Sequence, residues 1–172
     1  MSSQIAHLIN KRIIKNDIFI TPIELAKFHI STINCQPDNI WYDPFRNNGV
    51  YYNNYPVCIT NRRWSEILKG RDFLTESIET GAVICSNPPY SILDMVIKRC
   101  IELDPFIISL LIGVGNLTAR RIEILEKAGF KIVFLHMCKV YKWYGMSYIV
   151  NFQKQNGNGI LSYDRVVWKE DK

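Results

Sequence analysis

A short apolar run that ends in two consecutive prolines constrains the fold of this chain more than any other stretch. Residues Val83–Ser86 are apolar or small, and they lead directly into Asn87-Pro88-Pro89-Tyr90. A run of this kind between turn residues is typical of a buried parallel strand. Both prolines lack a backbone N–H, and Pro89 restricts Pro88 to an extended conformation. The sequence therefore predicts a rigid corner at the carboxyl end of a buried strand.

An amphipathic helix is predicted to follow this corner directly. Ser91 and Asp94 favour its start, and Asp104-Pro105 ends it. Between them, apolar residues recur with the spacing of one helical face: Leu93, Val96, Ile97, Cys100 and Ile101. Ligands of open α/β sheets bind at the carboxyl ends of the strands. A rigid corner with an amide, a free carbonyl and an aromatic ring suits a flat ring that carries an amine. A plain turn with a packed tyrosine is the simpler alternative.

Strand and helix patterns alternate along the rest of the chain. We expect strands at residues 40–42, 82–86, 106–112, 132–135, 148–152 and 165–168, with one more between residues 57 and 67. Helices are expected over residues 1–15, after the capping sequence Thr21-Pro22-Ile23-Glu24, near residues 50–55, and over residues 118–128. This alternation predicts an α/β sandwich with a mostly parallel sheet and an antiparallel hairpin at one edge.

Length and composition limit the class of protein. The 172 residues suit one domain, in which residues 1–36 supply N-terminal helices and a segment beside the ligand site. No run approaches the roughly 18 apolar residues of a membrane span, and the N-terminus lacks a secretory signal pattern, so we expect a cytoplasmic or otherwise intracellular protein. The cysteines and histidines lack metal-ligand spacing, so no metal site is expected. The net charge of +5 is compatible with a polyanionic partner.

A second corner is predicted after the strand at residues 40–42. Residues 43–49, Asp-Pro-Phe-Arg-Asn-Asn-Gly, form a turn between a strand and a helix, and Gly49 lets backbone approach a ligand closely. Asp43 either fixes this turn or meets a cationic amine. The two corners project from the carboxyl ends of the first and the fourth strand, so we expect them to face one cleft.

Two further acidic residues follow this loop in the sequence, at spacings that are typical of nucleoside-binding sites. Glu66 is the next acidic residue after Asp43, and it stands where such sites bind ribose hydroxyls. Asp72-Phe73 offers an acceptor beside an aromatic face, which suits an adenine ring. Surface carboxylates are the alternative interpretation of both acids.

Together these motifs resemble S-adenosylmethionine (SAM)-dependent amino-methyltransferases, most closely the compact N6-adenine DNA methyltransferases. The family signature Asp/Asn/Ser-Pro-Pro-Tyr/Phe is met by residues 87–90, and the cofactor loop Asp-Pro-Phe-x-Gly-x-Gly is met by Asp43-Pro44-Phe45 and Gly49. The extended segment ending in Thr-Pro is similar to residues 17–22, and the Trp-x-Glu-Ile and Asp-Phe elements to residues 64–67 and 72–73. The resemblance covers roughly residues 16–153.

The resemblance implies a Rossmann-like class I methyltransferase fold and a set of site residues. Catalysis is implied at Asn87, Pro88, Pro89 and Tyr90. Binding of SAM is implied at Phe19, Thr21, Pro22, Asp43, Pro44, Phe45, Asn47, Gly49, Glu66, Asp72 and Phe73. Lys142, Trp143, Tyr144 and Gly145 lie on a loop after the sixth strand that could flank a target base, although a packed hairpin explains these aromatic residues equally simply.

The chain also departs from the family pattern. Asn47 stands where the first glycine of the cofactor loop is expected. Asparagine tolerates left-handed backbone better than other non-glycine residues, so the turn can form, but its side chain can crowd the methionine end of SAM. The interval from Asp43 to Asn87 is short for three strand-helix crossovers, so one element must be reduced. No segment is long enough for a separate target-recognition domain.

The implied reaction is methyl transfer from SAM to the exocyclic N6 amine of adenine in DNA. The Asn87 side-chain oxygen and the Pro88 carbonyl would accept the two amine hydrogens, Tyr90 would stack on the base, and a duplex base must leave the helix to reach them. Several alternatives remain open. They are N4-cytosine methylation, methylation of adenine or guanine in RNA, methylation of protein glutamine, and a non-catalytic methyltransferase-like subunit that binds nucleic acid.

Overall fold

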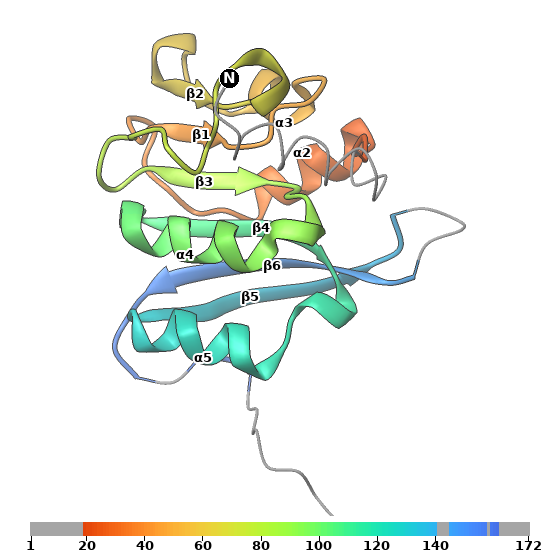
Figure 1. Ribbon diagram of the computed structural model, residues 1–172, viewed down its shortest axis with the longest axis vertical. Coiled ribbons are helices and arrows are strands. Elements are labelled where there is room, and N and C mark those ends of the chain that lie inside the picture. Colours follow the sequence, from red (N-terminus) through yellow and green to blue (C-terminus); the bar gives the residue numbers. More distant parts are fainter. Residues whose placement is uncertain (1–18, 141–144, 158, 162–172) are drawn as a thin grey trace, which may run out of the picture.

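A six-stranded sheet forms the centre of the computed structural model, which describes residues 19–140, 145–157 and 159–161. The strand order is β2-β1-β3-β4-β6-β5, seen from top to bottom in Figure 1. The strands are β1 (Trp41–Asp43), β2 (Arg62–Trp64), β3 (Val83–Ser86), β4 (Ile107–Gly113), β5 (Phe130–Cys138) and β6 (Ser147–Lys154). Strands β2, β1, β3 and β4 pair in parallel, whereas β6 pairs antiparallel with both β4 and β5. The predicted mostly parallel sheet with an antiparallel hairpin at one edge is confirmed.

Helices cover both faces of this sheet. The helices α4 (Leu93–Leu103) and α5 (Ala119–Lys127) lie over the near face in Figure 1. The helices α2 (Ile23–Ser31) and α3 (Val50–Asn54) pack on the opposite face, where their apolar residues join the core of β1 and β3. Two hydrophobic clusters result, one on each side of the central strands.

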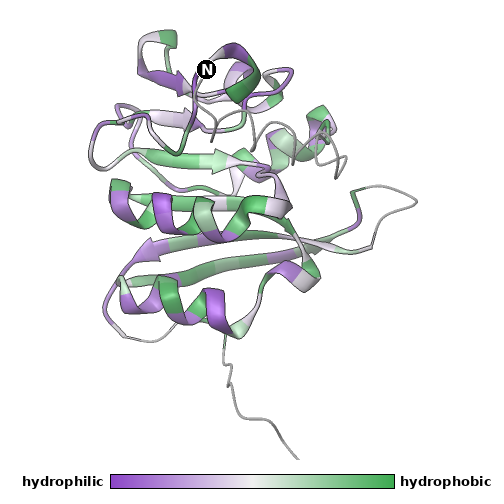
Figure 2. Cartoon of the chain, viewed as in Figure 1, coloured by the Kyte–Doolittle hydropathy of each residue, from purple (hydrophilic) through white to green (hydrophobic). Residues whose placement is uncertain are grey.

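The central strands carry the strongest apolar signal in the chain. Every residue of β3 and β4 is buried, and both strands are largely green in the hydropathy colouring of Figure 2. Because β4 is covered on both faces, truncating one of its isoleucines to alanine would cost about 2–5 kcal/mol. The sheet is therefore a rigid support for the loops at its carboxyl edge.

Two predicted helix caps are wrong. The helix after Thr21 begins at Ile23, with Pro22 as the N-cap and no side-chain capping bond, because the Thr21 hydroxyl instead accepts a hydrogen bond from Asn87. Ser91 does not cap α4 either, since a 3-10 turn over Tyr90–Ile92 separates the corner from the helix. The predicted end of α4 at Asp104 is confirmed, and the helix predicted over residues 118–128 is observed as α5, with Thr118 as its N-cap.

The segment between the two corners is reduced, as its length predicts. Between β2 and β3 the described residues contain only a 3-10 helix, Ile67–Lys69, and loops. Asn87 therefore follows the third strand along the described chain, not the fourth. The predicted helix over residues 1–15 and the predicted strand at 165–168 lie outside the described residues. Within the described residues, no helix has the length and apolar character needed to span a membrane.

Candidate functional site

The two predicted corners lie side by side at the carboxyl edge of the sheet. Strands β1 and β3 are neighbours, with Trp41 opposite Val83 and Tyr42 opposite Ile84. At their ends, the Ser86 hydroxyl donates to Asp43 Oδ1 over 2.7 Å. This bond joins the strand that leads to Asn87 to the strand that leads to Gly49.

Asp43 organises the loop that follows β1. Its Oδ1 also accepts from the Phe45 N–H over 3.3 Å, so the carboxyl group fixes the start of the turn. The side chain is fully buried, and this burial raises the pKa of Asp43 to about 7, against the lowering effect of the bonds from Ser86 and Phe45. Of the two roles that the sequence left open for Asp43, the structure supports fixing the turn.

The rest of this loop depends on two residues in left-handed backbone. Asn47 has φ 47° and Gly49 has φ 85°. A Cβ at Gly49 would lie 3.1 Å from Asn53 Nδ2, so the position suits glycine for space as well as for conformation. Gly49 is also the N-cap of α3, which places this helix directly behind the loop.

Glu66 holds the same loop from the side of β2. It is only 3% exposed, and its Oε2 accepts from the Asn47 N–H over 2.9 Å. Its Oε1 accepts from the Leu68 N–H over 3.2 Å. The predicted acid thus holds the loop that follows β1, and its role toward a ribose stays a prediction.

An open cleft lies between the two corners. Residues from the N-terminal segment, both corners and α3 line it: Phe19, Thr21, Phe45, Arg46, Asn47, Asn48, Val50, Tyr51, Asn87 and Pro89. The Asn47 side chain reaches across toward the Phe19 carbonyl, 3.5 Å from its Nδ2. The cleft therefore gathers residues from both predicted corners, as expected for parts of one site.

One end of the Asn87 amide is hydrogen-bonded within the protein, and the other end is not bonded to any described residue. Its Nδ2 donates to Thr21 Oγ1 over 3.2 Å. Its Oδ1 is buried and has no hydrogen-bond partner among the described residues. A buried acceptor without a donor costs about 1–3 kcal/mol, so this oxygen is suited to accept from a ligand that carries an N–H.

The remaining residues of the proline corner give the cleft its walls. Pro88 and Pro89 are buried, and Pro89 has the extended conformation, φ −67° and ψ 120°. The half-buried Tyr90 ring lies 6.5 Å from the Phe19 ring, tilted by 34°. The corner is therefore rigid where the sequence predicts rigidity, with an aromatic pair beside it.

A second, more apolar slot adjoins the first. It is lined by Pro44, Phe45, Ile67, Asp72, Phe73, Leu74 and Ile92. The Phe45 ring, which borders both spaces, meets the buried Phe73 ring edge-on at 5.5 Å. Asp72 Oδ1 accepts from the Leu74 N–H over 3.0 Å, which fixes the direction of its carboxylate.

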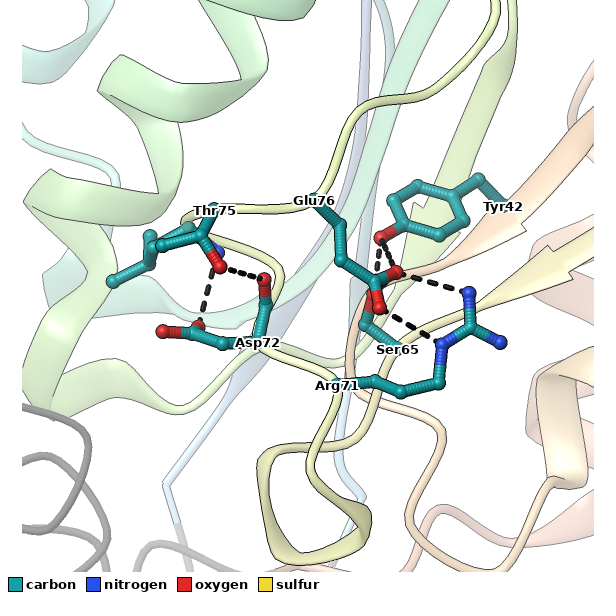
Figure 3. A network of polar contacts seen from close by, with 7 residues as sticks. Tyr42, Ser65, Arg71, Asp72, Thr75 and Glu76 are labelled. Atoms are coloured by element: carbon teal, nitrogen blue, oxygen red, sulfur yellow. Dashed lines mark hydrogen bonds and ion pairs between the residues drawn. The ribbon is translucent and has the colours of Figure 1, made fainter. Parts of the chain in front are cut away.

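A polar network holds the loop that carries Asp72 (Figure 3). Arg71 binds Glu76 with two bonds, of 2.8 Å and 3.0 Å. Ser65 at the end of β2 donates to the same carboxylate over 2.8 Å, and the Tyr42 hydroxyl bonds Ser65. The slot is thereby tied to β1 and β2.

Comparison with known proteins identifies the fold. No protein-family model and no curated protein matches the sequence. Solved structures do match: a precorrin-6y C5,15-methyltransferase from Geobacter metallireducens has a TM-score of 0.59 at 16% identity, covering 79% of this chain and 90% of that one. The chain has a methyltransferase fold.

Two further methyltransferase structures agree. A magnesium protoporphyrin IX methyltransferase from Synechocystis, solved with bound SAM, gives a TM-score of 0.56 at 10% identity, covering 77% of this chain and 78% of that one. The 23S rRNA methyltransferase ErmE gives a TM-score of 0.56 at 12% identity, covering 85% of this chain and 73% of that one. These likenesses establish the fold of the chain but not its substrate.

Some predicted site residues of this methyltransferase fold are not described. Lys142, Trp143 and Tyr144 lie outside the described residues, and Gly145 is exposed just before β6. Their loop follows β5, not a sixth strand as predicted. Pro22 is exposed as the N-cap of α2. The described residues contain no group of three or more His, Cys, Asp and Glu side chains that could hold a metal ion.

Sequence reasoning missed Arg46 as a residue of the cleft. Its guanidinium lies 5.0 Å from the Tyr52 ring and 4.7 Å from the Trp64 ring. It contacts no hydrogen-bond acceptor among the described residues, and its Nε is buried. Its position within the loop of residues 43–49 was the available signal.

Proposed function

We propose that this protein transfers the methyl group of SAM to the exocyclic amine of a nucleobase, with N6 of adenine in DNA as the first candidate. The observation that carries the proposal is Asn87, a residue that lines the cleft, whose buried Oδ1 lacks a donor among the described residues while its Nδ2 is held by Thr21. An amine N–H is the complementary group.

The amine presents a specific chemical problem. The lone pair of adenine N6 is shared with the ring, so the nitrogen is a poor nucleophile. Acceptance of its two hydrogens by Asn87 Oδ1 and the Pro88 carbonyl would favour tetrahedral geometry at the nitrogen and free its lone pair. Tyr90 and Phe19 offer aromatic faces for the base. Such a mechanism relies on positioning and fixed dipoles, so it needs no side chain with a tuned pKa.

The residues around Phe45 suit SAM. The apolar slot lined by Phe45, Phe73 and Asp72 has the aromatic edges and the acceptor that suit an adenine ring, and the loop of Asn47 and Gly49 leads from there to the Asn87 cleft. When bound, SAM supplies an electrophilic methyl group on a sulfonium. The chain's part is to hold the nucleobase amine against Asn87 and Pro88.

A nucleic-acid substrate is favoured by the charge at the cleft. Arg46 lies at the border of the cleft. Among the described residues, its guanidinium is contacted by aromatic rings and by no carboxylate. A guanidinium of this kind suits a phosphate. The net charge of +5 points the same way. A base in a duplex must be flipped out to reach Asn87, whereas a base in single-stranded DNA or RNA need not.

A product assay tests the proposal. Purified protein is incubated with methyl-labelled SAM and, separately, with duplex DNA, single-stranded DNA, RNA and a protein mixture, and the digested nucleosides are analysed by mass spectrometry. We expect N6-methyladenine from DNA. N6-methyladenine or a methylguanine from RNA would instead assign the RNA alternative. N4-methylcytosine or label in protein would replace adenine as the target, and binding of nucleic acid without SAM affinity would indicate a non-catalytic subunit.

A further inference from the structure

Positive charge without carboxylate partners collects at the β2 edge of the sheet. Residues 44–71 contain five lysine and arginine residues but a single acidic residue, Glu66, so this segment supplies most of the net charge of +5. Elsewhere, six described lysine and arginine side chains form ion pairs with carboxylates, which balances their charge locally. The excess of positive charge at β2 is therefore a local feature of the surface.

The acidic residues of this region are already bound within the protein. Glu66 is only 3% exposed, and both of its oxygens accept from backbone N–H groups. Glu76 binds Arg71 (Figure 3), and Glu79 binds Arg63 over 2.7 Å. Three cations of the segment form no ion pair with a described residue. They are Arg46, Arg62 and Lys69.

These three cations lie close together around two aromatic rings. The Arg46 guanidinium is 4.7 Å and the Lys69 ammonium 5.9 Å from the centroid of the Trp64 ring. The Arg46 guanidinium is also 5.0 Å from the Tyr52 ring, and Arg62 donates to the Tyr52 carbonyl over 3.0 Å. We call this group the β2 cluster. Its members are Arg46, Tyr52, Arg62, Trp64 and Lys69.

The contacts within the β2 cluster hold the cations without cancelling their charge. Arg62 donates to three backbone carbonyls, those of Tyr52, Asn53 and Val57, and none of these groups carries a charge. Aromatic rings hold Arg46 and Lys69 by their faces and likewise leave the positive charge in place. Side chains that are held before binding lose less conformational entropy when a ligand arrives. The cluster is therefore preorganised for an anion.

The β2 cluster is continuous with the cleft and extends to an open edge of the sheet. Arg46 lines the cleft together with Asn87, and Trp64 is the last residue of β2. Strand β2 is the outermost strand in Figure 1, and among the described strands it pairs only with β1. Lys69 is exposed beyond it. A row of cations thus leads away from the cleft on one side.

We propose that the β2 cluster binds the phosphate backbone on one side of the target base, so that the substrate strand leaves the cleft over β2. A nucleic-acid strand carries both a base for Asn87 and a row of phosphates beside it, which matches the row of cations. Contacts to phosphates position a strand without reading its sequence. The inference rests on the proposed function and adds the path of the strand to it.

Lys69→Gln tests the proposal, because the Lys69 side chain is exposed and makes no hydrogen bond or ion pair with a described residue. Binding of fluorescein-labelled single-stranded DNA, with one adenine among thymines, is measured by anisotropy over a series of salt concentrations. The slope of the logarithm of the binding constant against the logarithm of the salt concentration should fall by about 0.7, the effect of one phosphate in a single strand. At about 0.1 M salt, the affinity should fall about fivefold.

Lys98→Gln is the matched control. Lys98 is an exposed lysine of α4 that also forms no ion pair with a described residue, but it lies on a helix that packs in the other hydrophobic cluster. Its replacement removes the same charge and should leave the slope unchanged. Equal falls of the slope in both variants, or no fall in Lys69→Gln, would overturn the proposal.

The position of the β2 cluster on one side of the cleft allows a second measurement. Two DNA single strands share the target adenine, and thymines extend one only on its 5′ side and the other only on its 3′ side. Methylation is followed as kcat/KM, which counts only strands whose adenine occupies the cleft. Lys69→Gln should lower kcat/KM about fivefold for one strand and less than about twofold for the other. Equal losses for both strands would contradict the proposed path.

The inference and the proposed function can fail separately. If the protein methylates no nucleic acid but the slope falls in Lys69→Gln and not in Lys98→Gln, the proposed function fails and the phosphate-binding surface is supported. If the protein methylates nucleic acid and the slope is unchanged in Lys69→Gln, only the β2 cluster is refuted as a phosphate site. Its charges would then serve to protect an edge strand from pairing with another chain.

Discussion

Asn87 and Thr21 lie 66 positions apart in the sequence, and in the structure the Asn87 amide nitrogen donates to the Thr21 hydroxyl over 3.2 Å. This contact joins the proline corner to the N-terminal segment, and the buried Asn87 Oδ1 has no partner among the described residues. The two segments therefore act as one unit, and a change to either should act mainly on the reacting amine.

Replacing Asn87 tests that expectation directly. In Asn87→Ala the acceptor for the amine is lost, so we expect kcat to fall by about 10²–10³-fold, the usual effect of removing one placed polar group at a reacting centre. The dissociation constant of SAM, measured by calorimetry, should remain within about twofold. Asn34→Ala, an exposed asparagine after α2, is the control. Wild-type turnover in Asn87→Ala would refute the role given to this side chain.

Asn47 is the main departure from the family pattern, and its replacement has two separable effects. It has φ 47°, and its side chain crosses the cleft toward Phe19. Asn47→Gly should stabilise the protein by about 1 kcal/mol by relieving the left-handed strain, and it should lower the dissociation constant of SAM by removing the side chain.

Asn47→Ala separates the two effects, because it removes the amide but keeps the strain of a Cβ. If crowding controls the affinity for SAM, both variants bind more tightly, and only Asn47→Gly becomes more stable in urea unfolding. Unchanged affinity in both variants would show that Asn47 does not restrict the cofactor.

The strands next to the site could be predicted because buried strands have continuous apolar sequences that are easily assigned. Strands β3 and β4 are buried along their whole length, so their apolar runs appear directly in the sequence. Strand β2 has only three half-buried residues, and its position could not be fixed within residues 57–67. Half-exposed β5 extends well beyond the predicted residues 132–135 for the same reason: its mixed pattern gives a weak signal.

The polar interior could not be predicted, because its partners are remote in sequence. Ser109 and His29 are 80 positions apart, and Ser109 and Asn151 are 42 apart. One signal was available: Ser109 is the only polar residue in the apolar run from Ile107 to Ile112. A lone hydroxyl in a buried strand needs a partner. The same remoteness explains the wrong cap at Thr21, whose hydroxyl bonds Asn87 instead of its own helix.

Burial of Asp43 predicts a stability change with pH. The pKa of the Asp43 carboxyl is 3.8 in the unfolded chain and about 7 in the folded protein. Between these values the folded state keeps a proton that the unfolded state has lost, so this group's contribution to stability is full below pH 4 and is lost as the pH rises through 7. The difference is on the order of a few kcal/mol.

Asp43→Asn isolates this contribution, because an amide can still accept from Ser86 and Phe45 but does not ionise. In urea unfolding, we expect the stability of the variant relative to wild type to rise between pH 5 and pH 8. The exposed Asp38→Asn is the control and should show no such rise. A difference between Asp43→Asn and wild type that is constant with pH would contradict a raised pKa for Asp43.

The position of Arg46 leads to a prediction of how the affinity for nucleic acid depends on salt concentration. Its guanidinium borders the cleft. Among the described residues it is contacted by aromatic rings and not by carboxylates, so a phosphate would meet an uncompensated charge. Each phosphate contact contributes about 0.9 to the slope of the logarithm of the binding constant against the logarithm of the salt concentration. Arg46→Gln should therefore reduce this slope by about 1 and weaken binding across sequences.

Arg120→Gln is the matched control for charge. Arg120 is an exposed residue of α5, a helix packed on the face opposite α3. The two variants lose the same charge, so a general effect of net charge would lower both slopes equally. A phosphate contact at the cleft lowers only that of Arg46→Gln. Arg46→Lys keeps the charge but loses the planar stacking on Tyr52 and Trp64, so its slope should stay near that of wild type while its affinity falls. Equal slopes for Arg46→Gln and Arg120→Gln would remove Arg46 from the nucleic-acid interface.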